Sequence, residues 1–282
     1  MGMSYRKISC GKGIKMDGKK KLTISQIRKM KKEGEKLVMV TSYDAAMARL
    51  AEAAGVDLIL VGDSVGPTML GYPDTVNVTM DQMVHHTAAV RRGAPNTFIV
   101  GDMPFLSCQV SIEETMHNAA RLMQEGGCDA VKLESDSALA PTVERLVRAG
   151  IPVMAHIGLL PQSIKTSGVY RIQGKTEEAA ERLLNDARAM EEAGAFSTVI
   201  ECVPADVAEK ITKEISIPTI GIGAGLGCDG QVQVITDILG LSPFTPKHAK
   251  KYGELGVLIQ EILSTYTKEV KEGSFPGKEN SF

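Results

Sequence analysis

Leu58-Ile59-Leu60-Val61-Gly62-Asp63 is the stretch that decides the fold: four aliphatic residues, a glycine and an acid. An unbroken aliphatic run indicates a strand buried on both faces, as in parallel sheets covered by helices. The pattern returns at Ile99-Val100-Gly101-Asp102. Apolar strands that end in an acid predict a parallel α/β fold whose polar residues gather at the carboxyl edge of the sheet.

Short apolar runs alternate with helical stretches along the rest of the chain. We expect strands at 37–41, 57–62, 97–101, 130–134, 152–156, 197–202 and 218–222. We expect helices at 24–35, 45–54, 80–92, 113–125, 139–149, 177–193, 205–214 and 247–269. The segment 232–239 is ambiguous by pattern, but an eighth strand there would close a ring. Glycines follow five of these helices, at positions typical of helix ends: Gly55, Gly93, Gly126, Gly150 and Gly194.

This series predicts one (β/α)8 TIM barrel over residues 22–282, a single domain with an N-terminal helix before the first strand. A doubly wound open sheet is the alternative. The length of 282 residues is ordinary for one barrel.

Composition excludes several classes of function. With a net charge of −2, nothing recruits nucleic acid or an anionic membrane, and the aromatic fraction of 4% with no Trp argues against base stacking. No apolar run approaches the roughly 18 residues of a membrane span.

The five cysteines are irregularly spaced without a C-x-x-C, which favours a reducing compartment, and we expect the cytoplasm. Residues 1–21 are rich in Lys and Gly and are expected to be a flexible basic leader; a mitochondrial presequence would favour Arg and Ser instead.

Ionisable residues close five of the expected strands at their carboxyl ends: Asp63, Asp102, Glu134, His156 and Glu201. In a barrel these ends converge on one mouth, where active sites lie. Because alternate residues of a strand share a face, Lys132 and Glu134 point together into the lumen while their apolar neighbours face the helices.

Three carboxylates on consecutive strands, Asp63, Asp102 and Glu134, suit a hard cation such as Mg²⁺, which keeps water or substrate oxygens in its other positions. The alternative is that each acid pairs with a Lys or Arg and only stabilises the barrel. Glu201 is not needed for the metal set and is a candidate general base. His156 fits a substrate contact or an acid as well as it fits a structural residue.

Two glycine-rich segments lie at the expected mouth. Residues 66–75 are typical of an active-site loop or lid. Gly221-Ile222-Gly223-Ala224-Gly225 resembles a phosphate cradle, but no G-K-[ST] follows, so a tight backbone is the preferred interpretation.

At these residues the sequence resembles the ketopantoate hydroxymethyltransferase family. The resemblance runs collinearly from about Leu22 to Phe282 and rests on seven segments. They are 60–64 (LVGDS), 86–94 (HTAAVRRGA), 101–105 (GDMPF), 131–134 (VKLE), 156–163 (HIGLLPQS), 200–204 (IECVP) and 221–225 (GIGAG) with Asp229-Gly230-Gln231.

The resemblance implies a (β/α)8 barrel related to the phosphoenolpyruvate/pyruvate enzymes. Such an enzyme transfers a hydroxymethyl group from 5,10-methylenetetrahydrofolate to 3-methyl-2-oxobutanoate through a Mg²⁺-stabilised enolate, giving 2-dehydropantoate for pantothenate and coenzyme A. It further implies small-molecule partners, no nucleic acid, no membrane, and a large homo-oligomer, often a decamer.

The resemblance also assigns roles to residues. Asp63, Asp102 and Glu134 would hold Mg²⁺. The oxo acid would be contacted by Asp63, Ser64, Asp102 and Lys132, with His156 as a further candidate. Glu201 would accept the proton.

The sequence departs from the family pattern in the basic leader, at Val169, where a second Gly is common, and at Asn280, where His is common.

Two rival functions remain at this point. A carbon–carbon lyase or phosphonomutase of the same superfamily would often carry a loop cysteine that 71–74 lacks, and a non-catalytic barrel would leave the charges at the mouth unexplained.

Overall fold

The computed structural model describes residues 20–282, so the expected leader lies outside the described residues except for Lys20 and Lys21. The chain forms two compact units, one ending at Val232 and one from Gln233 to Phe282. We describe each by itself. No helix within residues 20–282 is long and apolar enough to cross a membrane.

Eight strands close into a barrel in sequence order, and the pairs from β1–β2 to β7–β8 are parallel. The strands are β1 (Leu37–Thr41), β2 (Leu58–Val61), β3 (Phe98–Asp102), β4 (Ala130–Glu134), β5 (Val153–Gly158), β6 (Ser197–Glu201), β7 (Thr219–Ile222) and β8 (Gly230–Gln233). The predicted TIM barrel is confirmed, and an open sheet is excluded.

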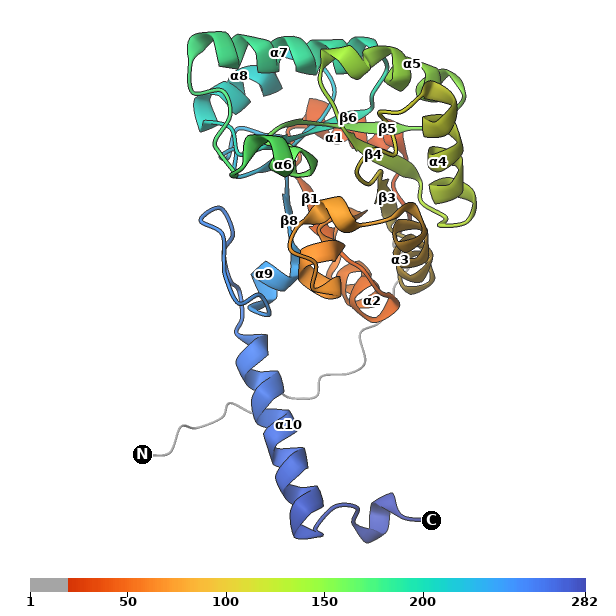
Figure 1. The fold of residues 1–282 in the computed structure, drawn as a ribbon, viewed down its shortest axis with the longest axis vertical. Helices are drawn as coiled ribbons and strands as arrows, with labels where there is room; N and C mark the ends of the chain where they lie inside the picture. Colours follow the sequence, from red (N-terminus) through yellow and green to blue (C-terminus); the bar gives the residue numbers. More distant parts are fainter. Residues whose placement is uncertain (1–19) are drawn as a thin grey trace. The chain divides into compact units, whose positions relative to one another are not determined.

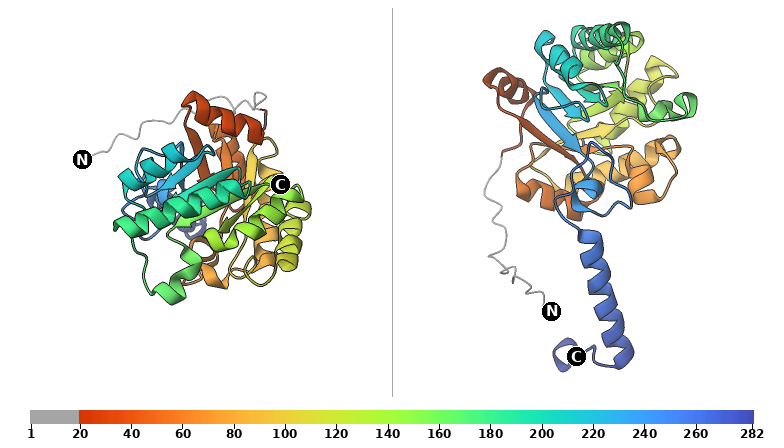
Figure 2. Two further views of the ribbon diagram at one scale, coloured as in Figure 1. Left: turned by 90° about the horizontal axis from the view of Figure 1, so that it is seen from above. Right: turned by 90° about the vertical axis from the view of Figure 1, so that its left-hand side faces the viewer.

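Helices surround these strands (Figures 1 and 2). They are α1 (Ile24–Glu33), α2 (Ala45–Ala54), α3 (Met80–Gly93), α4 (Ile112–Gln124), α5 (Ala140–Arg148), α6 (Ile164–Ser167), α7 (Glu177–Glu192) and α8 (Ala205–Glu214). Short helical turns lie in the loops: η1 (Gly66–Leu70), η2 (Thr75–Asn77), η3 (Ser137–Leu139) and η4 (Pro161–Ser163). Helix α3 packs on β2 and β3, α4 on β4, and α7 on β5 and β6.

Local signals set several helix ends. Thr23 and Thr79 each form a capping box with the Gln three residues on, which satisfies free N–H groups of α1 and α3. Not all five glycines predicted to end helices do so by a left-handed turn. Gly55, Gly150 and Gly194 have φ of 86°, 87° and 94°. Gly93 instead lies inside α3, where a Cβ would come within 2.3 Å of the Ala45 carbonyl oxygen, so close packing of α2 requires it.

The lumen is apolar at its base and polar at its mouth. Its lower layers belong to one buried cluster that includes Leu58 and Leu60 of β2, Phe98 and Val100 of β3, Ala130 of β4, Met154 of β5 and Val199 of β6. Two residues further along the same faces stand Asp102, Lys132, His156 and Glu201. The alternation of strand side chains therefore carries the charged residues into the lumen.

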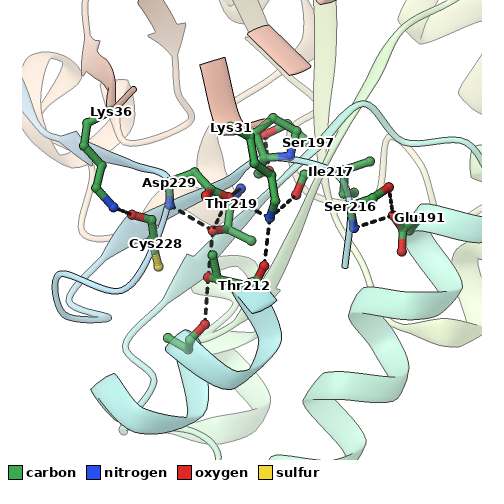
Figure 3. A network of polar contacts seen from close by, with 12 residues as sticks. Lys31, Lys36, Glu191, Ser197, Thr212, Ser216, Ile217, Thr219, Cys228 and Asp229 are labelled. Atoms are coloured by element: carbon green, nitrogen blue, oxygen red, sulfur yellow. Dashed lines mark hydrogen bonds and ion pairs between the residues drawn. The ribbon is translucent and has the colours of Figure 1, made fainter. Parts of the chain in front are cut away.

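Helix α1 is held to the base of the barrel by Lys31 (Figure 3). Its Nζ donates to the carbonyl oxygens of Thr212 at 2.8 Å and Ile217 at 3.1 Å, and to Asp229 Oδ2 at 2.9 Å. Asp229 Oδ2 also accepts the backbone N–H of Thr219 at 2.9 Å, at the start of β7. The barrel is thus tied at the face opposite its mouth.

Two expectations near the C-terminus are wrong. The eighth strand is β8 at 230–233, where Gln231 and Gln233 alternate with Val232, whereas Ile235–Leu239 is a helix, α9, ended by Gly240 at φ 70°. The terminal helix α10 begins at Leu255 rather than at 247. The segment 232–239 is ambiguous by pattern, and only its first two residues belong to the eighth strand; residues 235–239 form a helix, which Gly240 ends in a left-handed turn.

The second unit contains α9, α10 (Leu255–Glu272) and η5 (Lys278–Asn280). No residue of α10 is buried, and its exposed apolar side chains include Val257, Ile262 and Leu263 at 55%, 58% and 57%. Tyr266 packs edge-on against Phe275, with ring centroids 5.5 Å apart.

Candidate active site

Six of the sequence-predicted residues meet at the carboxyl ends of β2 to β6. Asp63 follows β2 and Asp102 ends β3, while Lys132 and Glu134 both belong to β4. His156 lies in β5 and Glu201 ends β6. All of them except Glu201 are buried.

A chain of contacts crosses the mouth from β3 to β6. Lys132 Nζ lies 2.8 Å from Asp102 Oδ1 and 3.3 Å from His156 Nδ1. His156 Nε2 lies 3.2 Å from Glu201 Oε2. The register explains the first contact, because Asp102 and Lys132 are direct partners in the β3–β4 pairing.

The charges along this row of contacts determine which of its side chains are protonated. Burial alone would lower the pKa of the Lys132 ammonium, but the carboxylates of Asp102, Asp63 and Glu134 outweigh burial and raise that pKa above its usual value. Burial and the nearby Lys132 charge lower the pKa of His156. His156 is therefore neutral at pH 7, accepting from Lys132 through Nδ1, while its Nε2 lies beside Glu201 Oε2 without an aligned hydrogen bond.

Asp63 and Glu134 are bridged by Gln162, a residue to which we had given no role. Its Nε2 donates to Asp63 Oδ2 at 2.8 Å and its backbone N–H donates to Glu134 Oε1 at 3.0 Å. Burial, followed by the charge of Asp102, raises the pKa of Asp63 to about 7. Burial, followed by the charge of Asp63, raises the pKa of Glu134 to about 9.

Ser64 stands at the edge of the site and shares a 2.8 Å hydrogen bond with the hydroxyl of Tyr43, which is buried. His86 Nδ1 lies 2.7 Å from the Tyr43 carbonyl oxygen. We had not predicted Tyr43. The signal available was its position two residues past β1, at the same edge as the other strand ends.

No three His, Cys, Asp or Glu side chains in residues 20–282 form a ready-made metal cage. The donor chemistry of Asp63, Asp102 and Glu134 nevertheless fits a divalent cation: three buried carboxylates face one buried ammonium, and burial disfavours their excess negative charge. Ser42 Oγ and Gln162 Oε1, both at the mouth, are buried without a hydrogen-bond partner within the described residues. This partial set suits a cation such as Mg²⁺, which takes its remaining oxygens from water or substrate.

The backbone beyond Glu201 is strained. Cys202 has a φ of 50°, which is unusual for a residue with a side chain, and strain of this kind concentrates at functional sites. Burial and then the charge of Glu201 raise the pKa of the Cys202 thiol to about 11, so the thiol stays protonated at neutral pH.

Two loops meet over the mouth. The 66–75 stretch, expected to be a loop or lid, contains η1 and leads into η2. Asp74 Oδ2 lies 2.5 Å from Lys165 Nζ of α6, and hydrogen bonding to Lys165 lowers the pKa of Asp74. The β2–α3 loop is thereby joined to the segment that carries Gln162.

The sequence matches one protein family over nearly its whole length. Residues 21–278 match the family model described as ketopantoate hydroxymethyltransferase. The 3-methyl-2-oxobutanoate hydroxymethyltransferase of Syntrophus aciditrophicus (strain SB) is 53% identical over 264 residues, 93% of this chain and 97% of that protein. The enzyme of the same name from Ignicoccus hospitalis (strain KIN4/I) is 56% identical over 259 residues, 92% of this chain and 98% of that protein.

Solved structures with a similar fold have low sequence identity. A phosphonopyruvate hydrolase superposes with a TM-score of 0.60 at 14% identity, covering 92% of this chain and 93% of its own. A 2,3-dimethylmalate lyase gives a TM-score of 0.56 at 16% identity, covering 92% and 90%. These likenesses concern the barrel fold alone.

Proposed function

The chain belongs to the ketopantoate hydroxymethyltransferase family, and we propose that the mouth of its barrel is the active site for that reaction. The protein is an enzyme that transfers a hydroxymethyl group to 3-methyl-2-oxobutanoate, a step of pantothenate biosynthesis. The donor we propose is 5,10-methylenetetrahydrofolate and the product is 2-dehydropantoate. The observation that carries the assignment of the site is the buried chain Asp102–Lys132–His156–Glu201 beside Asp63 and Glu134.

Asp63, Asp102 and Glu134 are the proposed ligands of Mg²⁺. Their support is the excess of buried negative charge and the raised pKa values of Asp63 and Glu134. When bound, Mg²⁺ would supply Lewis-acid stabilisation of the charge that develops on the 2-oxo group of the substrate.

Lys132 is proposed to bind the substrate carboxylate. An ammonium group has three N–H donors, and two of them have partners here, Asp102 and His156. The third is available for the oxo acid. Ser64, Asp63 and Asp102 would complete the contacts to the substrate.

Glu201 is proposed to take the C3 proton of 3-methyl-2-oxobutanoate on the oxygen that His156 does not contact. The electron pair left on C3 then forms the new bond to the folate methylene carbon. Both C–N bonds of that carbon break, water provides the hydroxyl group, and the two folate nitrogens take up the proton from C3 and the proton that water releases. The ring nitrogens of His156 lie 3.3 Å from Lys132 Nζ and 3.2 Å from Glu201 Oε2, which favours a role in orienting Glu201 over direct contact with substrate.

The two rival functions lack comparable support. The phosphonopyruvate hydrolase and the 2,3-dimethylmalate lyase share the fold at 14% and 16% identity, whereas the two hydroxymethyltransferases are identical to this chain at more than half of the aligned positions. A non-catalytic barrel does not account for membership of an enzyme family.

The assignment is tested by consumption of 3-methyl-2-oxobutanoate with methylenetetrahydrofolate and Mg²⁺. We expect stoichiometric formation of 2-dehydropantoate that stops when either is withheld. Turnover without the folate, or with release of a two-carbon fragment, would contradict it and favour a lyase.

We also propose a cytoplasmic homo-oligomer, with a decamer as the size implied by the family resemblance. Its support is the row of exposed apolar side chains on α10, because an apolar patch of this kind marks an interaction surface. Light scattering at micromolar concentration should give several times the 30.2 kDa of one chain, and a monomer would refute this proposal.

A further inference from the structure

Gln162 contacts two of the proposed metal ligands, and the proposed reaction gives it no role. The residue is 4% exposed and lies in η4, the turn that follows β5. Its Nε2 donates to Asp63 Oδ2 at 2.8 Å and to the Met103 carbonyl oxygen at 3.0 Å. Its backbone N–H donates to both carboxylate oxygens of Glu134, at 3.0 and 3.3 Å. One residue thus links the ends of β2, β3 and β4.

We propose that Gln162 is a positioning residue of the divalent-metal site, because it holds Asp63 and Glu134 in place as ligands. We also propose that Gln162 couples metal binding to seating of the η4–α6 segment, that is, to the state in which Gln162 is hydrogen-bonded to both carboxylates. This inference rests on the proposed magnesium site. Outer hydrogen-bond partners of this kind fix the orientation of carboxylate ligands. A neutral residue is suited to the task because its side-chain amide donates to Asp63 and its backbone N–H donates to Glu134 without adding a charge.

The remaining atom of this side chain points to a ligand as well. Gln162 Oε1 is buried and has no hydrogen-bond partner in the part of the chain that the structure describes. A buried acceptor without a donor costs free energy, so a water or hydroxyl that arrives with the metal or substrate would relieve that cost.

The same segment also contains Lys165, three residues after Gln162, which forms an ion pair with Asp74. The Lys165 side chain is 62% exposed, so this contact alone holds the segment weakly. If seating Gln162 strengthens metal binding, then metal binding must strengthen seating by the same factor, since coupling between two equilibria is reciprocal.

The first test uses the wild-type protein. Hydrogen exchange of the Gln162 backbone amide is measured by NMR with and without saturating Mg²⁺, in the absence of substrates. We expect exchange to slow by about tenfold or more, the coupling that an outer hydrogen bond gives. The Asn96 amide, which donates to the buried Glu52 carboxylate at 2.8 Å, is the matched control and should not change. Equal exchange of Gln162 in both states would overturn the coupling.

The second test compares Gln162→Met with Gln173→Met in titrations with Mn²⁺ followed by electron paramagnetic resonance. Met keeps the length of the side chain and removes its donors. Gln173 lies in the same connection, but its side-chain amide donates to the Arg171 carbonyl oxygen and to no proposed metal ligand. We expect Mn²⁺ to bind Gln162→Met about 10- to 100-fold more weakly, and Gln173→Met as tightly as wild type.

The outcomes separate the two proposals. If wild type binds no Mn²⁺, the metal site itself is wrong. If wild type and Gln162→Met bind Mn²⁺ equally, the metal site stands and the role of Gln162 is refuted. If Gln162→Met does not fold, the exchange measurement on wild type decides.

Discussion

Replacing Lys132 with Met separates a substrate-binding lysine from a structural one. The substitution keeps the side-chain length, removes the charge and leaves Asp102 without its partner at 2.8 Å. A charge-assisted hydrogen bond in a sheltered site contributes about 1.5–3 kcal/mol, which corresponds to roughly 10- to 150-fold in affinity. We therefore expect the KM for 3-methyl-2-oxobutanoate to rise on the order of 10²-fold.

Metal affinity should move in the opposite direction, because Lys132 repels a cation that binds the same carboxylates. Mn²⁺ should bind Lys132→Met at least as tightly as wild type, and its binding should restore the stability lost when Asp102 is left unpaired, about 3–5 kcal/mol. Calorimetry, thermal unfolding and steady-state kinetics measure these effects, with Lys210→Met as a surface control, whose side chain is 59% exposed. An unchanged KM together with lost stability would show that Lys132 is only a structural partner of the acids.

Three further predictions concern the metal and the base of the barrel. Asp102→Ala should abolish Mg²⁺-dependent activity while the barrel stays folded, and full activity in excess EDTA would exclude a metal role. The pKa values of Asp63 and Glu134 are raised to about 7 and 9, so the metal-free protein should lose stability as pH rises toward 9. Mg²⁺ affinity should increase over the same pH range, because the two carboxyl groups release their protons. A free energy of unfolding and a calorimetric Mg²⁺ affinity that do not change with pH would contradict this. Lys31→Met should lower the free energy of unfolding by about 2–3 kcal/mol, because its contacts to Asp229 and two carbonyl oxygens are lost. Lys29→Met should have little effect. Equal losses of stability in urea denaturation would refute the role of Lys31 at the base of the barrel.

Strand periodicity was enough to predict the barrel and the orientation of its charged residues. Lys132 and Glu134 face the lumen because they alternate with Val131 and Leu133, and the strand ends converge because parallel strands share one edge. The eighth strand was placed too far along the chain, at 232–239, because β8 is a short polar strand, in which Gln231 and Gln233 flank a single buried Val232.

Contacts made across loops could not be predicted from the sequence. Gln162 stood within a recognised segment, but only the folded chain brings its amide to Asp63, 99 residues away. The lowered pKa of His156 likewise depends on its burial and on Lys132, which reaches its Nδ1 from the neighbouring strand; together they outweigh the opposing charge of Glu201. Such pairings follow from barrel register and loop geometry, which local patterns do not determine.

The central claim is that Glu201 removes the C3 proton of 3-methyl-2-oxobutanoate. Its most direct test is exchange of that proton with D₂O, followed by NMR in wild type and Glu201→Gln with Mg²⁺ and without folate. Exchange isolates proton removal from the folate chemistry, and Gln preserves the shape of the side chain. We predict exchange slower by roughly 10²–10⁴-fold in Glu201→Gln, with binding of Mn²⁺ and the oxo acid retained. Exchange at the wild-type rate in that variant would contradict the account and assign the proton to another group.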